Sequence, residues 1–404
     1  MNVLSVNKFF WQKGGSESVF FAEMDLLEQN SHIVVPFSMQ SKNNKSSEYS
    51  KYFVREADYQ EAKLKDKIRF AANIVYSLEA KRKMSELLAD VEIDIAHFHI
   101  FQHQISPSVF GPIRNRNIPI ILTLHDLKPI CPIYKMYVDG SVCEKCKGAK
   151  FYNCFLNCCT KGSRLKSMVN TVEMYFHYAM GYYQNVDRYI AVSQFYRNKM
   201  IEFGFDADQL EYLPNFIDME AYPFDNSDDG YALYFGRLSE EKGLDTLLDA
   251  ASQRTEIPLV IAGAGPDESR LQKRVADEGL DHIRFVGYQS GESLKRWIAK
   301  SSFSIIPSRW YENCPMSVLE SFALCTPVLG ADIGGIPELI DVGIDGLLFR
   351  SGDHNDLAEK MKEMWSKGRE RKEMGRSGRE KVGRQYAPAN HYHELMRIYQ
   401  SVSV

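Results

Sequence analysis

Short apolar runs alternate along the chain with longer stretches in which apolar residues recur at helical spacing. This alternation is typical of parallel β-sheets whose strands are joined by helices. Ten runs are predicted as strands: Val3–Val6, His32–Pro36, Ile95–His99, Ile118–Leu124, Arg188–Val192, Ala232–Phe235, Leu259–Ala262, Ile283–Val286, Phe303–Ile306 and Thr326–Gly330. We therefore expect an α/β protein with two doubly wound parallel-sheet domains, in which ligands bind at the carboxyl ends of the strands.

The boundary between the two domains is expected near Pro214, where a strand meets a proline ahead of the polar stretch 225–230. The length of 404 residues is enough for two domains. We place the first domain at residues 1–213 and the second at residues 214–385. The remaining segment, residues 386–404, is predicted as a turn followed by an amphipathic helix.

The composition is that of an ordinary globular protein, with 44% hydrophobic and 25% charged residues. A net charge of −4 gives no general reason to expect a nucleic-acid partner. No apolar run approaches the ~18 residues that a membrane-spanning helix needs. The segment Met1–Lys13 is predicted as a strand and turn rather than a signal peptide. We expect a cytoplasmic protein that is soluble or attached peripherally to a membrane.

Two helical stretches have a second interpretation. One combines the apolar stripe Leu64, Ile68, Ala71, Val75 and Leu78 with the basic residues Lys63, Lys65, Lys67, Arg69 and 81–83. Such a helix can lie on anionic lipid, although packing on the sheet as a surface helix is expected here. The other, residues 165–183, is rich in tyrosine and could line an acceptor groove, but we expect its aromatic side chains in the core.

Six of the eight cysteines lie between Cys131 and Cys159, in an expected insert at residues 131–160. A disulfide framework is not expected in a chain without a secretion signal. The spacing of Cys143, Cys146, Cys154 and Cys158 resembles a structural zinc site, because one pair with two residues between can be completed by a second pair. The alternative is a set of free thiols in the insert. No histidine lies nearby at a ligand spacing, so catalytic zinc is not expected.

Two carboxylates, Glu312 and Glu320, bracket the turn between a predicted strand and a predicted helix. Pro315 suits the first helical position, and the N–H groups that follow it can bind an anion. A ligand that carries phosphates and vicinal hydroxyls, such as a nucleotide sugar, fits this combination. The alternative is a pair of surface charges.

A second candidate segment, residues 236–243, follows the first predicted strand of the second half. It places Arg237 and Lys242 where both can reach one diphosphate and stabilise a departing nucleotide. A solvated charge run is the alternative. The turn after the next strand, residues 263–266, lacks the third glycine of a dinucleotide-binding loop, because residue 268 is glutamate. Residues 285–288 could present backbone groups to a base.

In the first half, a Gly-Gly-Ser-Glu turn at 14–17 follows the first strand and opens a helix. His125 ends another strand beside Asp126 and could hydrogen-bond a reacting sugar. The other histidines nearby, His97, His99 and His103, are expected to be structural. An Asp-x-Asp sequence at 206–208 is interpreted as turn chemistry rather than a metal site.

These segments together resemble the family-four glycosyltransferases, which have the GT-B fold of two Rossmann-like domains facing each other across a cleft. The resemblance extends over nearly the whole chain. It is carried by residues 14–17, 125–126, 214–218, 236–243, 263–266, 312–320 and the Gly-Gly-Ile-Pro-Glu segment 334–338. The cysteine-rich insert is not general to that family. Residues Asn313 to Pro315 depart from many members, which leaves the donor sugar open.

The resemblance implies transfer from a nucleotide sugar with retention of configuration, without a catalytic cofactor or metal. Arg237 and Lys242 would bind the diphosphate and Glu320 the ribose hydroxyls. Glu312 would face the donor sugar, and Arg237, Lys242, Glu312 and His125 would form the reacting centre. The implied donor-binding set is Gly15, Arg237, Lys242, Gly265, Tyr288, Glu312, Asn313, Cys314, Pro315, Met316, Ser317 and Glu320.

The family implies UDP as the preferred nucleotide of the donor, with GDP second, and a glycan or lipid-linked glycan as the acceptor in bacterial polysaccharide synthesis. It also implies that the helix at 386–404 crosses back onto the first domain. No carboxylate is convincingly placed as a nucleophile, so we favour same-face attack, in which the leaving phosphate takes the acceptor proton. A nucleotide-sugar epimerase on the same fold and a non-catalytic scaffold of a polysaccharide assembly complex remain alternatives.

Overall fold

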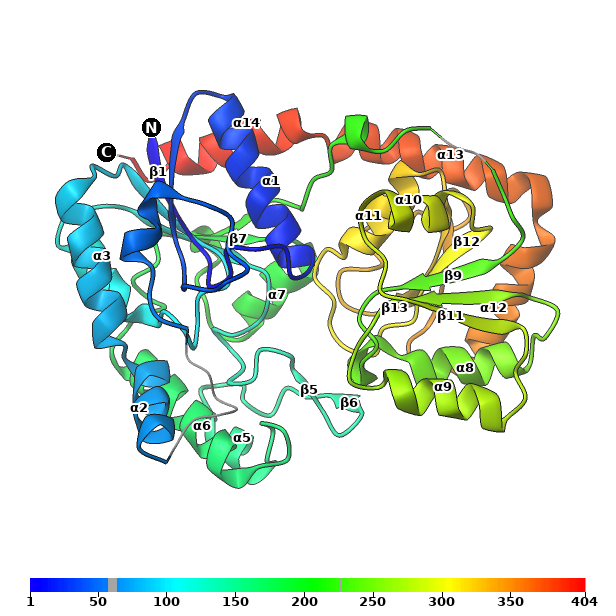
Figure 1. The fold of residues 1–404 in the computed structure, drawn as a ribbon, viewed down its shortest axis with the longest axis horizontal. Coiled ribbons are helices and arrows are strands. Elements are labelled where there is room, and N and C mark those ends of the chain that lie inside the picture. The colour runs from blue at the N-terminus through cyan, green and yellow to red at the C-terminus, as the bar shows by residue number, and fades with distance from the viewer. Residues whose placement is uncertain (57–63, 225–226, 404) are drawn as a thin grey trace. The chain divides into compact units, whose positions relative to one another are not determined.

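The computed structural model describes residues 1–56, 64–224 and 227–403, with the side chains of 64–69 excluded. It divides into two compact units. The first contains Met1–Met136, Glu144–Leu213 and Tyr392–Val404. The second contains Tyr137–Cys143 and Pro214–His391. Each unit is built on a six-stranded parallel sheet covered by helices (Figure 1). The predicted α/β class with two doubly wound parallel sheets is therefore confirmed.

The sheet of the first unit has the strand order β2-β1-β3-β4-β7-β8. Its strands are β1 (Asn2–Val6), β2 (Ile33–Phe37), β3 (Ile95–Phe98), β4 (Ile120–Leu124), β7 (Arg188–Ala191) and β8 (Leu210–Tyr212). All five strands predicted for this half are present. The predicted start of β4 was two residues early, because Pro119 has no N–H and contributes only its carbonyl, which accepts from Ala96.

The first unit also contains helices that flank this sheet or pack on one another. They are α1 (Gly15–Gln29), α2 (Leu64–Val75), α3 (Leu78–Asp90), α4 (Phe110–Arg114), α5 (Tyr152–Leu156), α6 (Arg164–Ala179), α7 (Gln194–Glu202) and α14 (Pro388–Gln400). Serine side chains accept backbone N–H groups at the starts of α3, α6 and α7. The C-terminal α14 contributes Leu395, Ile398 and Tyr399 to the same buried cluster as Val3 of β1.

The sheet of the second unit has the order β11-β10-β9-β12-β13-β14. Its strands are β9 (Ala232–Phe235), β10 (Leu259–Ala262), β11 (Ile283–Gly287), β12 (Phe303–Ile306), β13 (Val328–Asp332) and β14 (Gly346–Arg350). Its helices are α8 (Leu244–Ser252), α9 (Glu268–Asp277), α10 (Gly291–Ala299), α11 (Met316–Ala323), α12 (His354–Ser366) and α13 (Gly368–Gln385). The sequence analysis missed β14.

A short hairpin, β5 (Tyr137–Val138) with β6 (Ser141–Val142), is grouped with the second unit, although the sequence placed it in an insert of the first domain. The reason is local: Arg309 donates through Nη2 to the carbonyl of Gly140 at 2.7 Å. The tip of the hairpin therefore lies beside the turn that follows β12.

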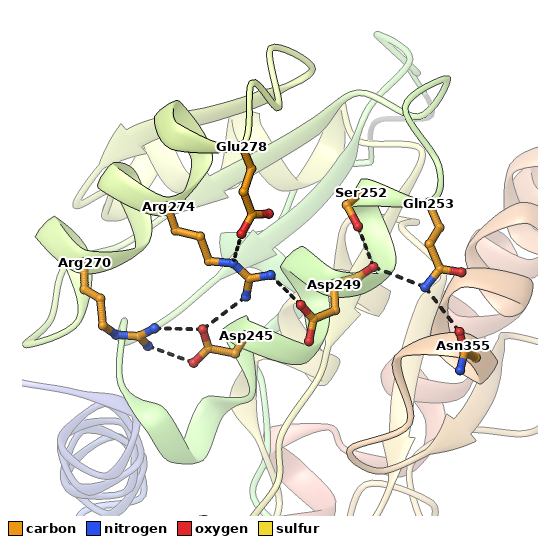
Figure 2. Close-up of polar contacts among 8 residues, drawn as sticks. All are labelled: Asp245, Asp249, Ser252, Gln253, Arg270, Arg274, Glu278 and Asn355. Carbon is orange, nitrogen blue, oxygen red and sulfur yellow. Dashed lines mark hydrogen bonds and ion pairs between the residues drawn. The ribbon is translucent and has the colours of Figure 1, made fainter.

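Ion pairs hold α8 against α9, the helices that follow β9 and β10 (Figure 2). Asp245 in the first turn of α8 accepts two hydrogen bonds of 2.8 Å from Arg270. Arg274 lies between Asp245, Asp249 and Glu278. These surface pairs add little stability individually, but the bidentate Arg270 contact fixes the direction in which α8 leaves its preceding loop.

The expectation that the aromatic residues of 165–183 lie in the core was largely wrong. Tyr175 and Tyr178 are exposed and Phe176 and Tyr182 are half-buried, while Tyr183 is buried. The basic side chains predicted at Lys63, Lys65, Lys67 and Arg69 lie outside the described residues. Among the described helices, none is both long and apolar enough to cross a membrane.

Candidate functional site

The second sheet reverses its direction of growth between β9 and β12. From β9 the chain builds outward through β10 and β11, and from β12 it builds the other way through β13 and β14. At such a point the two adjacent connections leave the sheet on opposite sides, and a crevice is left beyond the strand ends. The loop after β9 carries Arg237 and Lys242, and the loop after β12 carries Glu312. The sequence therefore brings the candidate cations and the candidate carboxylate to the switch point.

Glycines allow these loops to touch through their backbones. Gly243 has φ +75°, and a Cβ on it would lie 1.8 Å from the carbonyl oxygen of Pro307. Gly334 lets the next loop approach Glu312 in the same way, since a Cβ would lie 2.5 Å from the Glu312 carbonyl oxygen. The Gly335 N–H then donates to that carbonyl at 2.8 Å. Only glycine fits such contacts, so the loops form one rigid layer.

Gly265 is predicted to lie against the donor, and its missing side chain also allows a contact between loops. A Cβ there would lie 2.2 Å from the carbonyl oxygen of Leu238. Gly263 similarly accommodates the carbonyl of Gly236. The glycines at 263 and 265 therefore allow the loop after β10 to pack against the loop after β9, which carries Arg237. Arg237 and Tyr288 are both exposed.

Lys242 and Glu312 form an ion pair at this site. Lys242 Nζ donates to Glu312 Oε1 at 2.7 Å, and the Ser308 hydroxyl donates to the same oxygen at 2.5 Å. The Glu312 side chain is 6% exposed and the Lys242 side chain 25%. A nearly buried carboxylate needs such partners, whereas the ammonium keeps part of its surface open. Glu312 is therefore placed to aim Lys242, a relation that the sequence does not reveal.

Helix α11 begins directly after this carboxylate. Pro315 is its extended N-cap residue and Met316 the first helical residue, so the proline lies one position earlier than predicted. The turn before it is fixed by Asn215, whose side chain donates to the Cys314 carbonyl at 2.8 Å. Burial raises the pKa of the Cys314 thiol to about 12, so this side chain belongs to the core. The backbone from Asn313 to Ser317 leads into the helix start, where N–H groups favour an anion.

Glu320 lies in the second turn of α11. The Tyr222 hydroxyl donates to Glu320 Oε1 at 3.4 Å. Burial raises the pKa of Glu320 to about 7, although the Tyr222 hydroxyl and Lys295 act in the opposite direction. A half-buried carboxylate with few donors is suited to accept hydroxyl groups of a ligand. Tyr222 was missed by sequence reasoning, because no motif marks it and it lies 98 residues away.

In the first unit, the predicted residues Gly15 and His125 lie after β1 and β4. Gly15 is exposed and is the first residue of α1. His125 Nε2 lies 2.9 Å from Nδ1 of His99. Glu23 Oε1 in turn lies 3.4 Å from His99 Nε2 and 2.9 Å from His97 Nδ1. Burial, then the neighbouring His99 and His97, lower the pKa of His125 well below its ordinary value, so its imidazole is neutral at pH 7.

His99, which was expected to be structural, thus contacts His125 directly, and His97 lies beside His99. The overlooked signal is the His-x-His pattern at the end of β3, which puts His97 and His99 on one face of a strand adjacent to β4. His97 Nδ1 also lies 2.7 Å from the Tyr399 hydroxyl.

The predicted zinc site is not supported. In the described part of the chain, Glu23, His97 and His99 are the one group whose potential ligand atoms come within 4.8 Å of one another. Cys143, Cys146, Cys154 and Cys158 form no such group, and the eight cysteines are free thiols. Cys154 is buried and donates to the Ser167 carbonyl, and a hydrogen bond with Cys159 lowers the pKa of Cys154 to about 7. The spacing was misleading because Cys143 belongs, with the β5–β6 hairpin, to the second unit, whereas the other three cysteines belong to the first.

Sequence profiles of two known families match the chain. The profile described as Glycosyltransferase Family 4 matches residues 13–221, which is more than half of the chain. The chain belongs to glycosyltransferase family 4. A second profile, Glycosyl transferases group 1, matches residues 219–381 in the second unit. The resemblance that the sequence motifs carried is thereby confirmed.

Individual relatives of this family 4 chain are distant. An uncharacterized glycosyltransferase of Methanocaldococcus jannaschii is 29% identical over 206 residues, 51% of this chain and 56% of that protein. The amylovoran biosynthesis glycosyltransferase AmsK of Erwinia amylovora is 28% identical over 183 residues, 42% and 45% of the two chains. These matches therefore span about half of the relatives' lengths.

Solved structures match over almost the full length. Sucrose-phosphate synthase from Thermosynechococcus elongatus has a TM-score of 0.75 with 17% identity, covering 99% of this chain and 98% of the other. HepE of Anabaena, in complex with UDP-glucose, has a TM-score of 0.67 with 15% identity, covering 99% and 100%. At these identities the likeness establishes the fold, which is the GT-B type predicted for the family 4 chain.

Proposed function

We propose that this chain is a glycosyltransferase that moves a sugar from a nucleotide sugar, with UDP as the nucleotide, onto a glycan or lipid-linked glycan during polysaccharide synthesis. Family membership supports the reaction class. The names of AmsK and of the HepE complex support the pathway class and the UDP donor. The observation that carries the proposal is the Lys242–Glu312 pair beside the start of α11, at the topological switch point of the second sheet.

Cleavage of the bond between sugar and diphosphate leaves negative charge on the phosphate oxygens. In the proposed mechanism Lys242, held by Glu312, and Arg237 bind these oxygens together with the N–H groups at the start of α11. Glu320 accepts the ribose hydroxyls. Because these cations and dipoles lie on rigid loops, they stabilise the leaving group without having to reorganise during the reaction.

The same groups allow retention of configuration without a metal. Once the diphosphate has begun to leave, one of its oxygens lies on the face of the sugar that the acceptor approaches, and it can take the acceptor proton. The proposed route gives the Asp-x-Asp sequence no role in this step; Asp206 caps its own turn by accepting the Asp208 N–H at 3.0 Å. His125, neutral and oriented by His99, is proposed to hydrogen-bond the reacting sugar.

The first test is calorimetric binding of UDP, GDP and ADP to the whole chain and to Lys242→Ala. A charge-assisted hydrogen bond is worth about 1.5–3 kcal/mol, so the variant should lose about 10- to 150-fold in UDP affinity. Lys300→Ala, which removes a lysine whose partner is the exposed Asp229, should bind like the wild type. Equal UDP affinity in Lys242→Ala would contradict the assignment.

Turnover separates the remaining alternatives. Conversion of the donor into another nucleotide sugar without an acceptor would favour the epimerase. UDP binding with no turnover in the presence of glycan and lipid-linked acceptors would favour the scaffold.

A further inference from the structure

Helix α6 buries mostly polar side chains and exposes apolar ones, which is the reverse of an ordinary surface helix. The side chains that it buries are mostly polar: Ser167, Asn170, Thr171, Glu173, Met174 and His177. Its solvent face carries Leu165, which is 69% exposed, Met168, Val172, which is 52% exposed, and Tyr175. These four lie at spacings of three and four residues, so they form one apolar stripe. A helix that obeys the usual burial pattern would turn this stripe inward.

Buried polar contacts fix the helix in this orientation. Glu173 forms a 2.7 Å ion pair with Lys128, and both side chains are at most 1% exposed. His177 Nε2 lies 2.7 Å from the Val75 carbonyl oxygen. Rotating α6 to hide its apolar stripe would pull Glu173 away and leave Lys128 buried without its carboxylate, which is strongly unfavourable. The exposed stripe is therefore imposed by the fold.

The short helix α5 extends the apolar stripe. Its Leu156 is 62% exposed, and Tyr152 and Phe155 are exposed as well. The two helices pack together, since the Tyr175 hydroxyl accepts the Tyr152 N–H at 3.3 Å. We call the combined patch the α5–α6 surface; it consists of Tyr152, Phe155, Leu156, Leu165, Met168, Val172, Tyr175 and Tyr178. Two packed helices that expose this many apolar side chains mark an interaction site rather than ordinary surface.

The sequence that forms the α5–α6 surface is rich in basic residues. Between Glu144 and Glu173 the sequence contains no acidic residue. It contains six basic residues, all exposed: Lys145, Lys147, Lys150, Lys161, Arg164 and Lys166. Of these, Lys147 forms an ion pair with Glu202. Because the whole chain has a net charge of −4, this concentration of positive charge is a local feature.

We propose that the α5–α6 surface binds the surface of an anionic lipid bilayer. Exposed tyrosine, phenylalanine and leucine side chains with lysine and arginine nearby in the sequence are the combination that enters the boundary between headgroups and acyl chains. A second copy of the chain is a poor occupant, because a two-fold contact would bring the same basic residues face to face. Nucleic acid would leave the aliphatic stripe without a partner.

The proposal is independent of sugar transfer, and vesicle sedimentation of the full chain tests it without any donor. Vesicles of phosphatidylcholine with about one-third phosphatidylglycerol should pellet the protein. Pure phosphatidylcholine vesicles should retain at least tenfold less, since each basic residue near an anionic surface contributes about fivefold. Raising the salt concentration should weaken the binding.

Paired substitutions identify the surface. Leu165→Glu with Val172→Glu should reduce binding to anionic vesicles at least tenfold while leaving the thermal unfolding midpoint unchanged, because both side chains are exposed. Val342→Glu with Ile344→Glu, which are equally exposed in the second unit, is the matched control and should bind like the wild type. Wild-type binding by the α6 variant, equal binding to neutral and anionic vesicles, or a dimer in solution that the α6 variant dissociates would each overturn the proposal.

Discussion

Replacing Glu320 by glutamine should stabilise the protein at alkaline pH. Burial raises the pKa of this carboxyl from its ordinary 4.5 to about 7 in the folded state. Between these values the folded state binds a proton that the unfolded state has released, so the folding stability contributed by this group falls as the pH rises. One pKa unit corresponds to about 1.4 kcal/mol, and the step from 4.5 to about 7 therefore costs about 3 kcal/mol above pH 7.

Glutamine has the same shape but no charge to desolvate, and its amide oxygen can still accept the Tyr222 hydroxyl. Glu320→Gln should thus gain up to about 3 kcal/mol at pH 8 and much less at pH 5. The figure is an upper limit because the side chain keeps partial contact with solvent. For a unit of this size each kcal/mol moves the unfolding midpoint by roughly 2–4 °C.

Scanning calorimetry of wild type and variant at pH 5 and pH 8 measures the difference, which should be a higher midpoint for the variant at pH 8 only. Glu256→Gln, at an exposed position, should show no pH-dependent gain. A variant that is less stable at pH 8, or equally shifted at both pH values, would refute the reasoning. Glu320→Gln should also bind UDP more weakly, because the gain in stability comes with the loss of the charged carboxylate that is proposed to accept the ribose hydroxyls.

Two further changes test the framework of the units. Gly243→Ala should destabilise the second unit by more than about 2 kcal/mol, because it combines the left-handed backbone with a Cβ 1.8 Å from the Pro307 oxygen. The control Gly279→Ala, at φ +63° with open space around it, should cost only about 1 kcal/mol. Equal unfolding midpoints for the two variants would contradict the packing argument. Glu173→Gln should cost about 3–5 kcal/mol by denaturant unfolding, whereas Lys128→Met with Glu173→Leu should recover most of it.

The Glu173 pair also predicts a dependence on pH. Although burial acts to raise it, Lys128 and His103 hold the pKa of Glu173 at about 2. Its stabilisation is therefore fully present above pH 4.5 and is lost as the pH falls toward 2. The double variant Lys128→Met with Glu173→Leu should lack this loss of stability in acid. If its stability falls with pH as that of the wild type does, the result would argue against the ion pair.

The sheets were predictable because strands that are buried on both faces form continuous apolar runs. The edge strand β14 (Gly346–Arg350) was missed because it is short and contains glycine and arginine. Helix α6 shows the limit of apolar periodicity. The pairing of Glu173 with Lys128, 45 residues apart, decides which face is buried, and no local pattern encodes it.

The candidate site was predictable to a similar degree. The spacing of Glu312 and Glu320 and the glycines of the β9 loop pointed to the strand ends of the second sheet, and the structure places these segments after β9 and β12. The sequence could not show that Glu312 contacts Lys242, 70 residues earlier, because that contact depends on how two loops pack. The partners of His125 were within reach of pattern reasoning, since His-x-His on a central strand places both rings on one face.

The first unit is assembled from both ends of the polypeptide. Strand β1 (Asn2–Val6) is synthesised long before Leu395, Ile398 and Tyr399, which complete the same buried cluster. Until those residues emerge, the apolar side chains of β1 and α1 lack their cover. The last segment of the second unit, Pro214–His391, ends directly before Tyr392, so its final residues are synthesised only shortly before those of the first unit. During synthesis the first unit therefore keeps apolar side chains uncovered for longer than the second unit, most of which is one continuous segment.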